Sequence, residues 1–405
     1  METHVIRTTG ELPRAAEILE QGGMCAVPTE TVYGLCVNGL SPEAVAALYE
    51  IKGRPEVKPL ALMIPDAEAM ERYGQSIPPA AKKLAERFWP GPLTIIVPAR
   101  EDIVPAVIRA GGKSIGFRCP DHPLTLALLG QLDFPLAGPS ANPSGAPSPK
   151  SAEDVLGYFD GQIGAVLDGG VCGLGRESTV LDMSALPYRI LRQGALSAED
   201  IGDALRETLT VVGITGGTGS GKTTALNMLR ELGALILDCD EIYHELLAQE
   251  GEMVSEILVR FPEAAEGGKL VRKKLGGIVF ADPAALLDLN AITHRHVNAE
   301  VARRLAEHAR RGGTLAAIDA IALLESGLGD TCRCTVAVTA PAEQRVARLI
   351  QREGIREEYA RARIAAQKSD EWFRERCTYT LENSGSRTAF EAACRELFAN
   401  ILKSE

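Results

Sequence analysis

No stretch of this sequence is apolar for long enough to cross a membrane, and its first residues lack the basic-then-apolar order of a secretion signal. The nine cysteines are scattered and odd in number, so they predict no disulfide framework. Cys332 and Cys334 are close together but have no histidine or second pair nearby, which disfavours a zinc site. Reduced thiols without a leader favour a cytoplasmic protein that has no contact with membranes.

An excess of positive charge is also missing. The net charge is −11, while 45% of the residues are hydrophobic and 24% are charged, as in an ordinary globular protein. Such an acidic chain is not expected to bind DNA through bulk charge, so any contact with phosphate groups must come from local clusters. With 405 residues, the chain is long enough for two or three domains.

The most specific motif lies in the middle of the chain, where residues 216–223 match the phosphate-binding pattern Gly-x-x-x-x-Gly-Lys-Ser/Thr. Residues 209–215 resemble a buried strand, and residues 224–232 have helical spacing. Lys222 should reach the β- and γ-phosphates of a nucleotide, and the Thr223 hydroxyl should hold Mg²⁺. The predicted nucleotide ligands are Gly217, Thr218, Gly219, Ser220, Gly221, Lys222, Thr223 and Thr224.

Two acids follow the next apolar segment. Residues 233–240 read as a short strand that ends in Asp238 and Asp240, which places both carboxylates beside the phosphate crevice of a parallel α/β sheet. Asp240 could accept a proton from a hydroxyl nucleophile or order a water bound to Mg²⁺, although a solvated acid at a strand end has the same pattern. Residues 314–319 and 334–339 are predicted as further buried strands.

Three arginines come after these strands. Arg345, Arg348 and Arg352 are spaced by three and four residues, so they share one face of a helix. In a phosphoryl-transfer enzyme such a row often lies on a mobile lid over the nucleotide. A solvated basic face is the alternative.

These features resemble dephospho-CoA kinase, which phosphorylates the ribose 3′-hydroxyl of dephospho-CoA with ATP. The matching segments are Asp238 and Asp240 with residues 213–223, 289–294, 319–325, 345–349, 361–367 and 382–385. The resemblance implies a P-loop kinase domain at residues 208–403, with a parallel sheet, a helical acceptor region, a lid and Mg²⁺ bound with ATP. Asp240 is then the catalytic base, with Lys222 also in the catalytic set. The family usually has Asp-x-Pro-Leu-Leu-x-Glu where residues 319–325 read Asp-Ala-Ile-Ala-Leu-Leu-Glu, a departure that concerns the fit of the acceptor.

The first half of the chain carries hydroxyls and cations in several short motifs. Residues 28–35 read Pro-Thr-Glu-Thr-Val-Tyr-Gly-Leu, residues 52–55 read Lys-Gly-Arg-Pro, and residues 140–145 read Ser-Ala-Asn-Pro-Ser-Gly. Each is unspecific alone, and cations also suit the C-terminus of a helix. Because no obvious catalytic base accompanies them, the set favours the binding and positioning of polyanions.

In this order, the motifs resemble threonylcarbamoyl-adenylate synthases of the YrdC-like family, which join L-threonine, bicarbonate and ATP into threonylcarbamoyl-AMP for the modification of certain tRNAs. The resemblance implies a domain at residues 5–200 with a twisted mixed sheet and helices, Mg²⁺ with the triphosphate, and tRNA or a tRNA-modification transferase complex as a further partner. Lys52 and Arg54 are the implied catalytic residues. The implied nucleotide ligands are Lys52, Arg54, Ser114, Ser140, Asn142, Ser148 and Arg192, and the implied threonine ligands are Thr31, Arg118 and Thr179.

Three hypotheses remain for an α/β chain of this kind. The first is a bifunctional enzyme with two separate nucleotide sites. The second is a P-loop kinase with an N-terminal RNA-binding module that uses Lys52, Arg54 and Lys58, which the acidity of the chain disfavours. The third is a P-loop kinase for another small acceptor, such as a nucleoside, with a regulatory first half. The segments around Gln367 and Asn383 disfavour the third.

Overall fold

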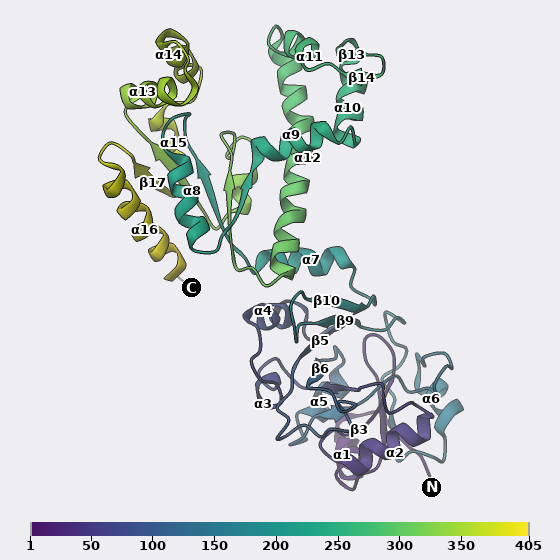
Figure 1. The fold of residues 1–405 in the computed structure, drawn as a ribbon. Coiled ribbons are helices and arrows are strands. Elements are labelled where there is room, and N and C mark those ends of the chain that lie inside the picture. Colours follow the sequence, from purple (N-terminus) through teal and green to yellow (C-terminus); the bar gives the residue numbers. More distant parts are fainter. Residues whose placement is uncertain (1, 404–405) are drawn as a thin grey trace. The chain divides into compact units, whose positions relative to one another are not determined.

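The computed structural model describes residues 2–403 (Figure 1). The chain divides into two compact units: the first runs to Leu205 and includes Arg310–Gly312, and the second holds Arg206–Ala309 and the residues from Gly313 on. Both units combine helices with a β-sheet, which confirms the α/β class predicted from the sequence.

The first unit is built on a ten-stranded sheet with the order β1-β8-β2-β3-β7-β4-β6-β5-β9-β10. The sheet contains parallel pairs such as β4 with β6 and antiparallel pairs such as β5 with β6, so it is mixed, as predicted. The strands are β1 His4–Ile6, β2 Cys25–Val27, β3 Gly34–Asn38, β4 Ala61–Met63, β5 Leu93–Pro98, β6 Ser114–Arg118, β7 Leu136–Ala137, β8 Ala165–Leu167, β9 Thr179–Asp182 and β10 Arg189–Arg192.

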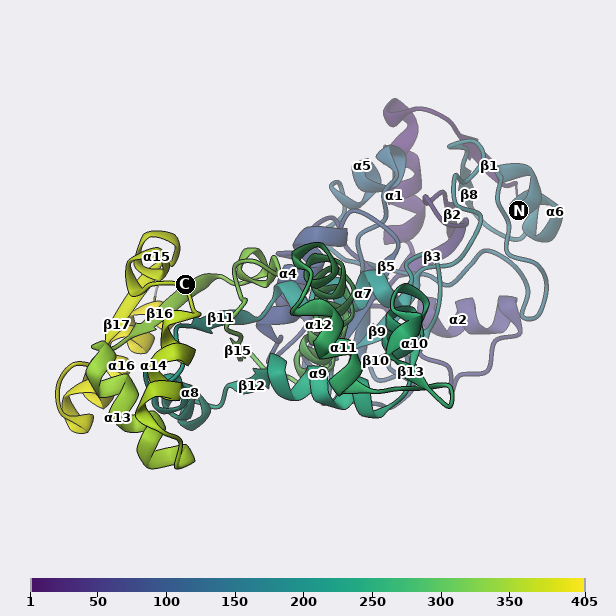
Figure 2. The same cartoon turned by 90° about the horizontal axis from the view of Figure 1, so that it is seen from above.

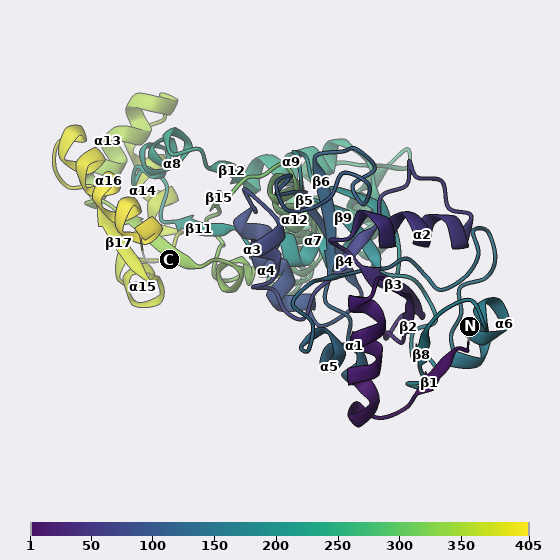
Figure 3. The same cartoon turned by 90° about the horizontal axis from the view of Figure 1, so that it is seen from below.

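Seven helices accompany this sheet in the described chain: α1 Leu12–Glu20, α2 Pro42–Lys52, α3 Met70–Tyr73, α4 Pro79–Phe88, α5 Pro123–Leu129, α6 Ala152–Phe159 and α7 Ala198–Glu207. Helices α1 and α5 lie side by side and bury a shared apolar core that includes Leu12, Leu128 and Leu167 (Figure 3). Helix α2 begins at the Ser41 cap and ends at Gly53, whose φ of 56° suits glycine. This ending fixes the cationic residues on either side of Gly53.

The second unit contains a five-stranded parallel sheet with the order β12-β15-β11-β16-β17 (Figure 2). Its strands are β11 Thr210–Thr215, β12 Leu235–Asp238, β15 Leu315–Asp319, β16 Cys334–Thr339 and β17 Tyr379–Glu382. Strands β11 and β16 are buried along their whole length because helices cover both faces of such a sheet. Helices α8 Lys222–Glu231 and α16 Arg387–Lys403 pack against each other through a core that includes Leu229, Phe390 and Phe398.

Two helical regions extend from this parallel sheet. The first comprises α9 Cys239–Ala248, α10 Glu252–Arg260, α11 Arg272–Val279, the long α12 Pro283–Arg310 and the hairpin β13 Ala265–Glu266 with β14 Lys269–Leu270. It has an apolar cluster of its own that includes Ile257, Phe261 and Leu289. The second region, which we call the arm, comprises α13 Ala342–Glu353, α14 Glu357–Ala365 and α15 Asp370–Arg376. Helices α13 and α14 pack together at its outer end (Figure 1). Among residues 2–403, no helix combines the length and the apolar character that a membrane crossing needs.

Candidate active sites

The phosphate-binding motif of the second unit forms the turn between β11 and α8. Strand β11 ends at Thr215 and α8 begins at Lys222, within two residues of the predicted boundaries. Gly221 has a φ of 109°, and a Cβ atom at this position would overlap the Asn383 side chain. A Cβ atom at Gly217 would overlap the guanidinium group of Arg345. Neighbouring side chains therefore favour glycine at both positions, and at Gly221 the backbone conformation favours it as well.

Lys222 and Thr223 lie at the N-terminus of α8. The ammonium group of Lys222 donates a hydrogen bond to the Gly216 carbonyl over 3.2 Å, so it folds back over the loop. The Thr223 side chain is exposed, whereas Thr224 is half-buried. This arrangement leaves the Thr223 hydroxyl accessible beside the positive end of the helix dipole.

Carboxylates end the two strands next to β11. Asp238, at the end of β12, caps α9 by accepting hydrogen bonds from the N–H groups of Asp240 and Glu241 at 2.9 and 3.1 Å. Asp240 therefore lies in the first turn of α9, because the Asp238 cap starts the helix there. The sequence had suggested instead that Asp240 lies at the end of the strand. Asp319, at the end of β15, is the register partner of Asp238.

Asp319 is the most perturbed acid of this site. Burial raises its pKa to about 6; the nearby Lys222 opposes this rise, and the negative charges of Asp238 and Asp240 add to it. Its Oδ1 atom is buried and has no hydrogen-bond partner among residues 2–403. An unsatisfied buried carboxylate oxygen beside a phosphate-binding loop is suited to a cation or a water that arrives with the substrate.

Asp240 also lines a cavity of about 270 Å³ that is formed by α9, α12 and the segment after β15. The cavity is lined by Cys239, Asp240, Tyr243, Leu289, Asn290, Thr293, His294, Val297, Asn298, Ala320, Ile321, Ala322, Ser326 and Leu328. Two of these, Ile321 and Ala322, are residues at which the chain departs from the kinase pattern. The cavity joins apolar walls to a few polar groups, as small-molecule sites commonly do.

The structure separates the three arginines predicted to form a lid. Arg345 is buried and its Nε donates to the Thr218 carbonyl at 2.9 Å. Arg348 donates to the carbonyls of Gly219 and Ser220, both at 3.2 Å. Arg352 is exposed and pairs with Glu353. Two of the three arginines thus bind the outer carbonyls of the loop, and a lid that moves over the nucleotide stays a prediction.

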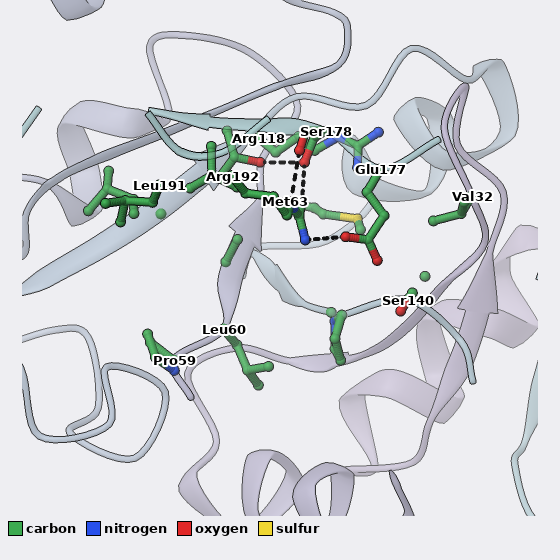
Figure 4. Close-up of a pocket in the computed structure, with 18 of the residues that line it drawn as sticks. Val32, Pro59, Leu60, Met63, Arg118, Ser140, Glu177, Ser178, Leu191 and Arg192 are labelled. Carbon is green, nitrogen blue, oxygen red and sulfur yellow. Dashed lines mark hydrogen bonds and ion pairs between the residues drawn. The ribbon is translucent and has the colours of Figure 1, made fainter. Parts of the chain in front are cut away.

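The first unit has a cavity of about 320 Å³ (Figure 4). Of the residues predicted from the sequence, Arg54, Ser114, Arg118, Ser140 and Arg192 line it. Three cationic side chains that enter one cavity can bind the carboxylate and phosphate groups of small substrates.

Arg118 lies at the end of β6 and is buried. Its Nη2 atom donates to the carboxylate of Glu30 at 2.9 Å and to the hydroxyls of Thr29 and Thr31 at 3.2 and 2.5 Å. Its Nε atom is buried and has no partner in the described part of the chain. Thr31 thus accepts a hydrogen bond from Arg118, although Thr31 itself does not line the cavity in the described chain. The binding of threonine by these two residues stays a prediction.

Two residues that are adjacent in the sequence hold Arg192 on one wall of the cavity. Its Nε and Nη2 atoms donate to the carbonyl and the hydroxyl of Ser178 at 3.1 and 3.0 Å, and Nη1 pairs with Glu177 (Figure 4). Ser148 donates to the other Glu177 oxygen at 3.4 Å. Burial lowers the pKa of Arg192, with the Glu177 charge acting in the opposite direction. Glu177 is thus an acidic member of a cationic cavity.

Lys52 does not line the cavity in the described chain but holds the loop that carries Ser140. Its ammonium group donates to the backbone carbonyls of Ser140 and Asn142, and burial lowers its pKa to about 8. Arg54 lies at the rim, where it donates to the carbonyls of Lys58 and Pro59 at 3.3 and 3.1 Å. In this structure Lys52 shapes the loop that carries Ser140, whereas Arg54 faces the cavity itself.

Thr179 occupies a different place from the cavity-lining residues. Its buried hydroxyl donates to the Leu196 carbonyl at 2.7 Å and accepts from the N–H groups of Gly194 and Leu196 at 3.0 Å each. These bonds use all of its hydrogen-bonding capacity in closing a turn. A part for Thr179 in threonine binding stays a prediction.

Comparison with known proteins gives a separate answer for each half. The model of the dephospho-CoA kinase family matches residues 210–389. A Corynebacterium diphtheriae dephospho-CoA kinase is 37% identical over 193 residues, which cover 47% of this chain and 96% of that protein. The Sua5, YciO and YrdC family, whose model carries the description "Telomere recombination", matches residues 17–194.

Relatives of the first half are named for a synthase. A Mycobacterium tuberculosis protein with the provisional name threonylcarbamoyl-AMP synthase is 32% identical over 191 residues, covering 47% of this chain and 87% of that protein. The chain belongs to both families. A Bacillus subtilis threonylcarbamoyl-AMP synthase is 44% identical over 191 residues, or 47% of this chain, but the chain spans only 55% of its length.

Several residues of the two sites were given no role by the sequence analysis. In the kinase half, Asp319 was part of a matching motif but was assigned no role. A second apolar strand that ends in an acid is the pattern that could have indicated it. In the YrdC-like half, Glu177 and Ser178 hold Arg192, and no pattern near Arg192 indicates them. Their partnership depends on the pairing of β9 with β10 and could not be read from spacing.

Proposed function

We propose that this chain is a bifunctional enzyme that acts in the cytoplasm. A domain at residues 5–200 forms L-threonylcarbamoyl-AMP from L-threonine, bicarbonate and ATP for tRNA modification. A domain at residues 208–403 phosphorylates the 3′-hydroxyl of dephospho-CoA with ATP. The observation that carries the proposal is that each compact unit has its own group of cationic side chains, at the cavity lined by Arg118 in the first and at the glycine-rich loop with Lys222 in the second.

In the kinase domain, the acceptor occupies the cavity beside Asp240. Asp240 accepts the proton of the 3′-hydroxyl while the oxygen of that hydroxyl bonds to the γ-phosphorus of ATP. The bond from this phosphorus to the leaving oxygen of ADP breaks in the same step. Lys222 and the N–H groups at the start of α8 stabilise the negative charge on the transferring group.

Oxygen ligands for Mg²⁺ are present in the same place. The exposed Thr223 hydroxyl and the unpartnered Oδ1 of Asp319 are of the type that this cation prefers. We assign Mg²⁺ to these two residues together with the nucleotide phosphates. When bound, the ion would neutralise charge on the β- and γ-phosphates.

In the synthase domain, Arg118 binds the carboxylate of threonine and is positioned by its hydrogen bond to Thr31. Arg54, Ser114, Ser140 and Arg192 bind the triphosphate. The threonine amine bonds to the carbon of bicarbonate and water leaves, which gives a carbamate. A carbamate oxygen then bonds to the α-phosphorus of ATP as pyrophosphate leaves. Lys52 and Asn142 position the loop that carries Ser140, while Ser148 contributes through Glu177. Charge-assisted hydrogen bonds of about 1.5–3 kcal/mol each hold the departing pyrophosphate.

A product assay tests both activities. Purified protein is incubated with labelled ATP, first with threonine and bicarbonate and then with dephospho-CoA, and the products are identified. Threonylcarbamoyl-AMP with pyrophosphate and CoA with ADP are the expected products. Phosphorylation of a nucleoside in place of dephospho-CoA would favour the kinase for another acceptor.

Replacing Gly217 with alanine should lower kinase activity by about 10- to 100-fold. The new methyl group would displace the Arg345 guanidinium from the loop, and such overpacking commonly costs about 1–3 kcal/mol. The kcat/KM for phosphorylation of dephospho-CoA measures the effect. Gly277→Ala is the matched control, because a Cβ atom there meets nothing within 4 Å. Equal activity of the two variants would contradict the proposed packing.

The kinase should also lose activity as the pH falls through about 6. Below this value the Asp319 carboxyl is protonated, since burial holds its pKa above the ordinary value, and it no longer offers a charged ligand to Mg²⁺. The kcat/KM of the native protein and of Asp319→Asn should be measured from pH 5 to 8. The variant should be slow throughout and lack the acidic limb, so an identical profile in both proteins would refute the assignment.

A further inference from the structure

Gln367 links the arm directly to the phosphate-binding loop. It lies between α14 and α15, 149 positions beyond Thr218 in the sequence. Its Oε1 accepts the Thr218 N–H at 2.9 Å, and its Nε2 donates to the Thr218 hydroxyl at 2.6 Å. A side-chain amide carries an acceptor and a donor side by side, which matches the two groups that Thr218 presents.

The same amide is fixed by Arg345. Nη2 of Arg345 donates to Oε1 of Gln367 at 2.8 Å, its Nε donates to the Thr218 carbonyl at 2.9 Å, and Nη1 pairs with Asp370 at 3.4 Å. The N–H, carbonyl and hydroxyl of Thr218 are therefore all bound by side chains of the arm. Arg345 is 4% exposed, so these bonds are shielded from water.

These hydrogen bonds hold the middle of the loop and not the end at which α8 begins. Thr218 lies four residues before Lys222, so its orientation fixes the path of the backbone into the turn whose N–H groups face phosphates. A loop that is held in this path before ATP arrives loses less conformational freedom on binding. The contacts thus favour ATP binding without touching ATP.

We propose that Gln367 is a positioning residue for ATP in the kinase site, and that it couples the placement of the arm to the shape of the phosphate-binding loop. The inference rests on the proposed kinase function. It predicts an effect on the affinity for ATP, whereas a brace that only stabilises the fold would lower the melting temperature and the affinity for both substrates.

The test compares Gln367→Leu with Gln367→Glu in the full-length protein. Leucine removes both hydrogen bonds, so the KM for ATP and the Kd of a non-hydrolysable ATP analogue should rise at least 10-fold. The KM for dephospho-CoA and the melting temperature without nucleotide should stay the same. Glutamate can still accept from the Thr218 N–H, the Thr218 hydroxyl and Arg345, so it should restore most of the affinity. Lys368→Leu is the matched control, because its ammonium group lies over the Trp372 ring and not on the loop.

The Kd is taken from the component of the binding isotherm that disappears in Lys222→Ala, which confines the measurement to the kinase site. An unchanged Kd in Gln367→Leu, or a loss of affinity that comes with equal losses for dephospho-CoA and in melting temperature, would overturn the proposal. If Gln367→Leu does not fold, Thr218→Val removes the hydroxyl partner alone and should raise the Kd about 3-fold; no rise would overturn the proposal. A protein that binds ATP in this pattern but does not phosphorylate dephospho-CoA would refute the proposed function and leave the role of Gln367 intact.

Discussion

Replacing Lys222 with alanine should abolish phosphorylation of dephospho-CoA and leave threonine-dependent release of pyrophosphate unchanged. Lys222 is a cation at the start of α8, close enough to Asp319 to oppose the rise in the pKa of that acid. Its removal takes away a charge that stabilises the transferring phosphoryl group, and the loss of one such group commonly costs about 10²- to 10³-fold in rate. Both activities should be measured on the same preparation.

The separation of the two activities is the informative part of this experiment. Lys222 belongs to the second compact unit, whereas the cavity around Arg118 is formed by residues of the first. Arg230→Ala serves as the control, because Arg230 is an exposed cation of the same helix that binds Asn227. If a folded Lys222→Ala variant lost both activities together, the model of two sites would be wrong.

The converse variant, Arg54→Ala, should stop formation of threonylcarbamoyl-AMP and spare the kinase. Arg54 lines the cavity of the first unit, where its guanidinium group donates to the carbonyls of Lys58 and Pro59. Its truncation therefore removes a cation from the predicted triphosphate site without leaving a buried acid unpaired. We expect a loss of about 10²-fold in the rate of pyrophosphate release.

Lys58→Ala provides the matched control for Arg54. Lys58 is an exposed cation of the same loop, and its side chain does not line the cavity among the described residues. Its loss should leave both activities near their native values. Normal threonylcarbamoyl-AMP formation by Arg54→Ala would remove Arg54 from the assigned site, and equal losses in both variants would indicate a general effect of loop charge.

Much of the kinase half could be predicted because its signals are local. The eight residues of the phosphate-binding motif determine the turn, and the strand and helix that flank it follow from short apolar patterns. Strand β16 covers the predicted residues 334–339. The place of Asp240 in the first turn of α9 was missed, because an Asp that caps a helix and a strand that ends in acids have the same local composition.

The supports of both sites could not be predicted, since they join distant parts of the chain. Asn383 donates to the Ser220 carbonyl at 2.8 Å across 163 positions, and Lys52 reaches the Asn142 carbonyl across 90. The resemblance to the YrdC-like family implied that Lys52 is a ligand of the nucleotide, which stays a prediction. Only the tertiary structure reveals that backbone carbonyls surround its ammonium group.

The central claim is that each unit binds its own ATP. Calorimetric titration of the full-length protein with a non-hydrolysable ATP analogue and Mg²⁺ measures this directly. The account predicts two equivalents bound per chain, of which Lys222→Ala loses one and Arg54→Ala loses or weakens the other. A single equivalent in the native protein, abolished by either substitution, would contradict it.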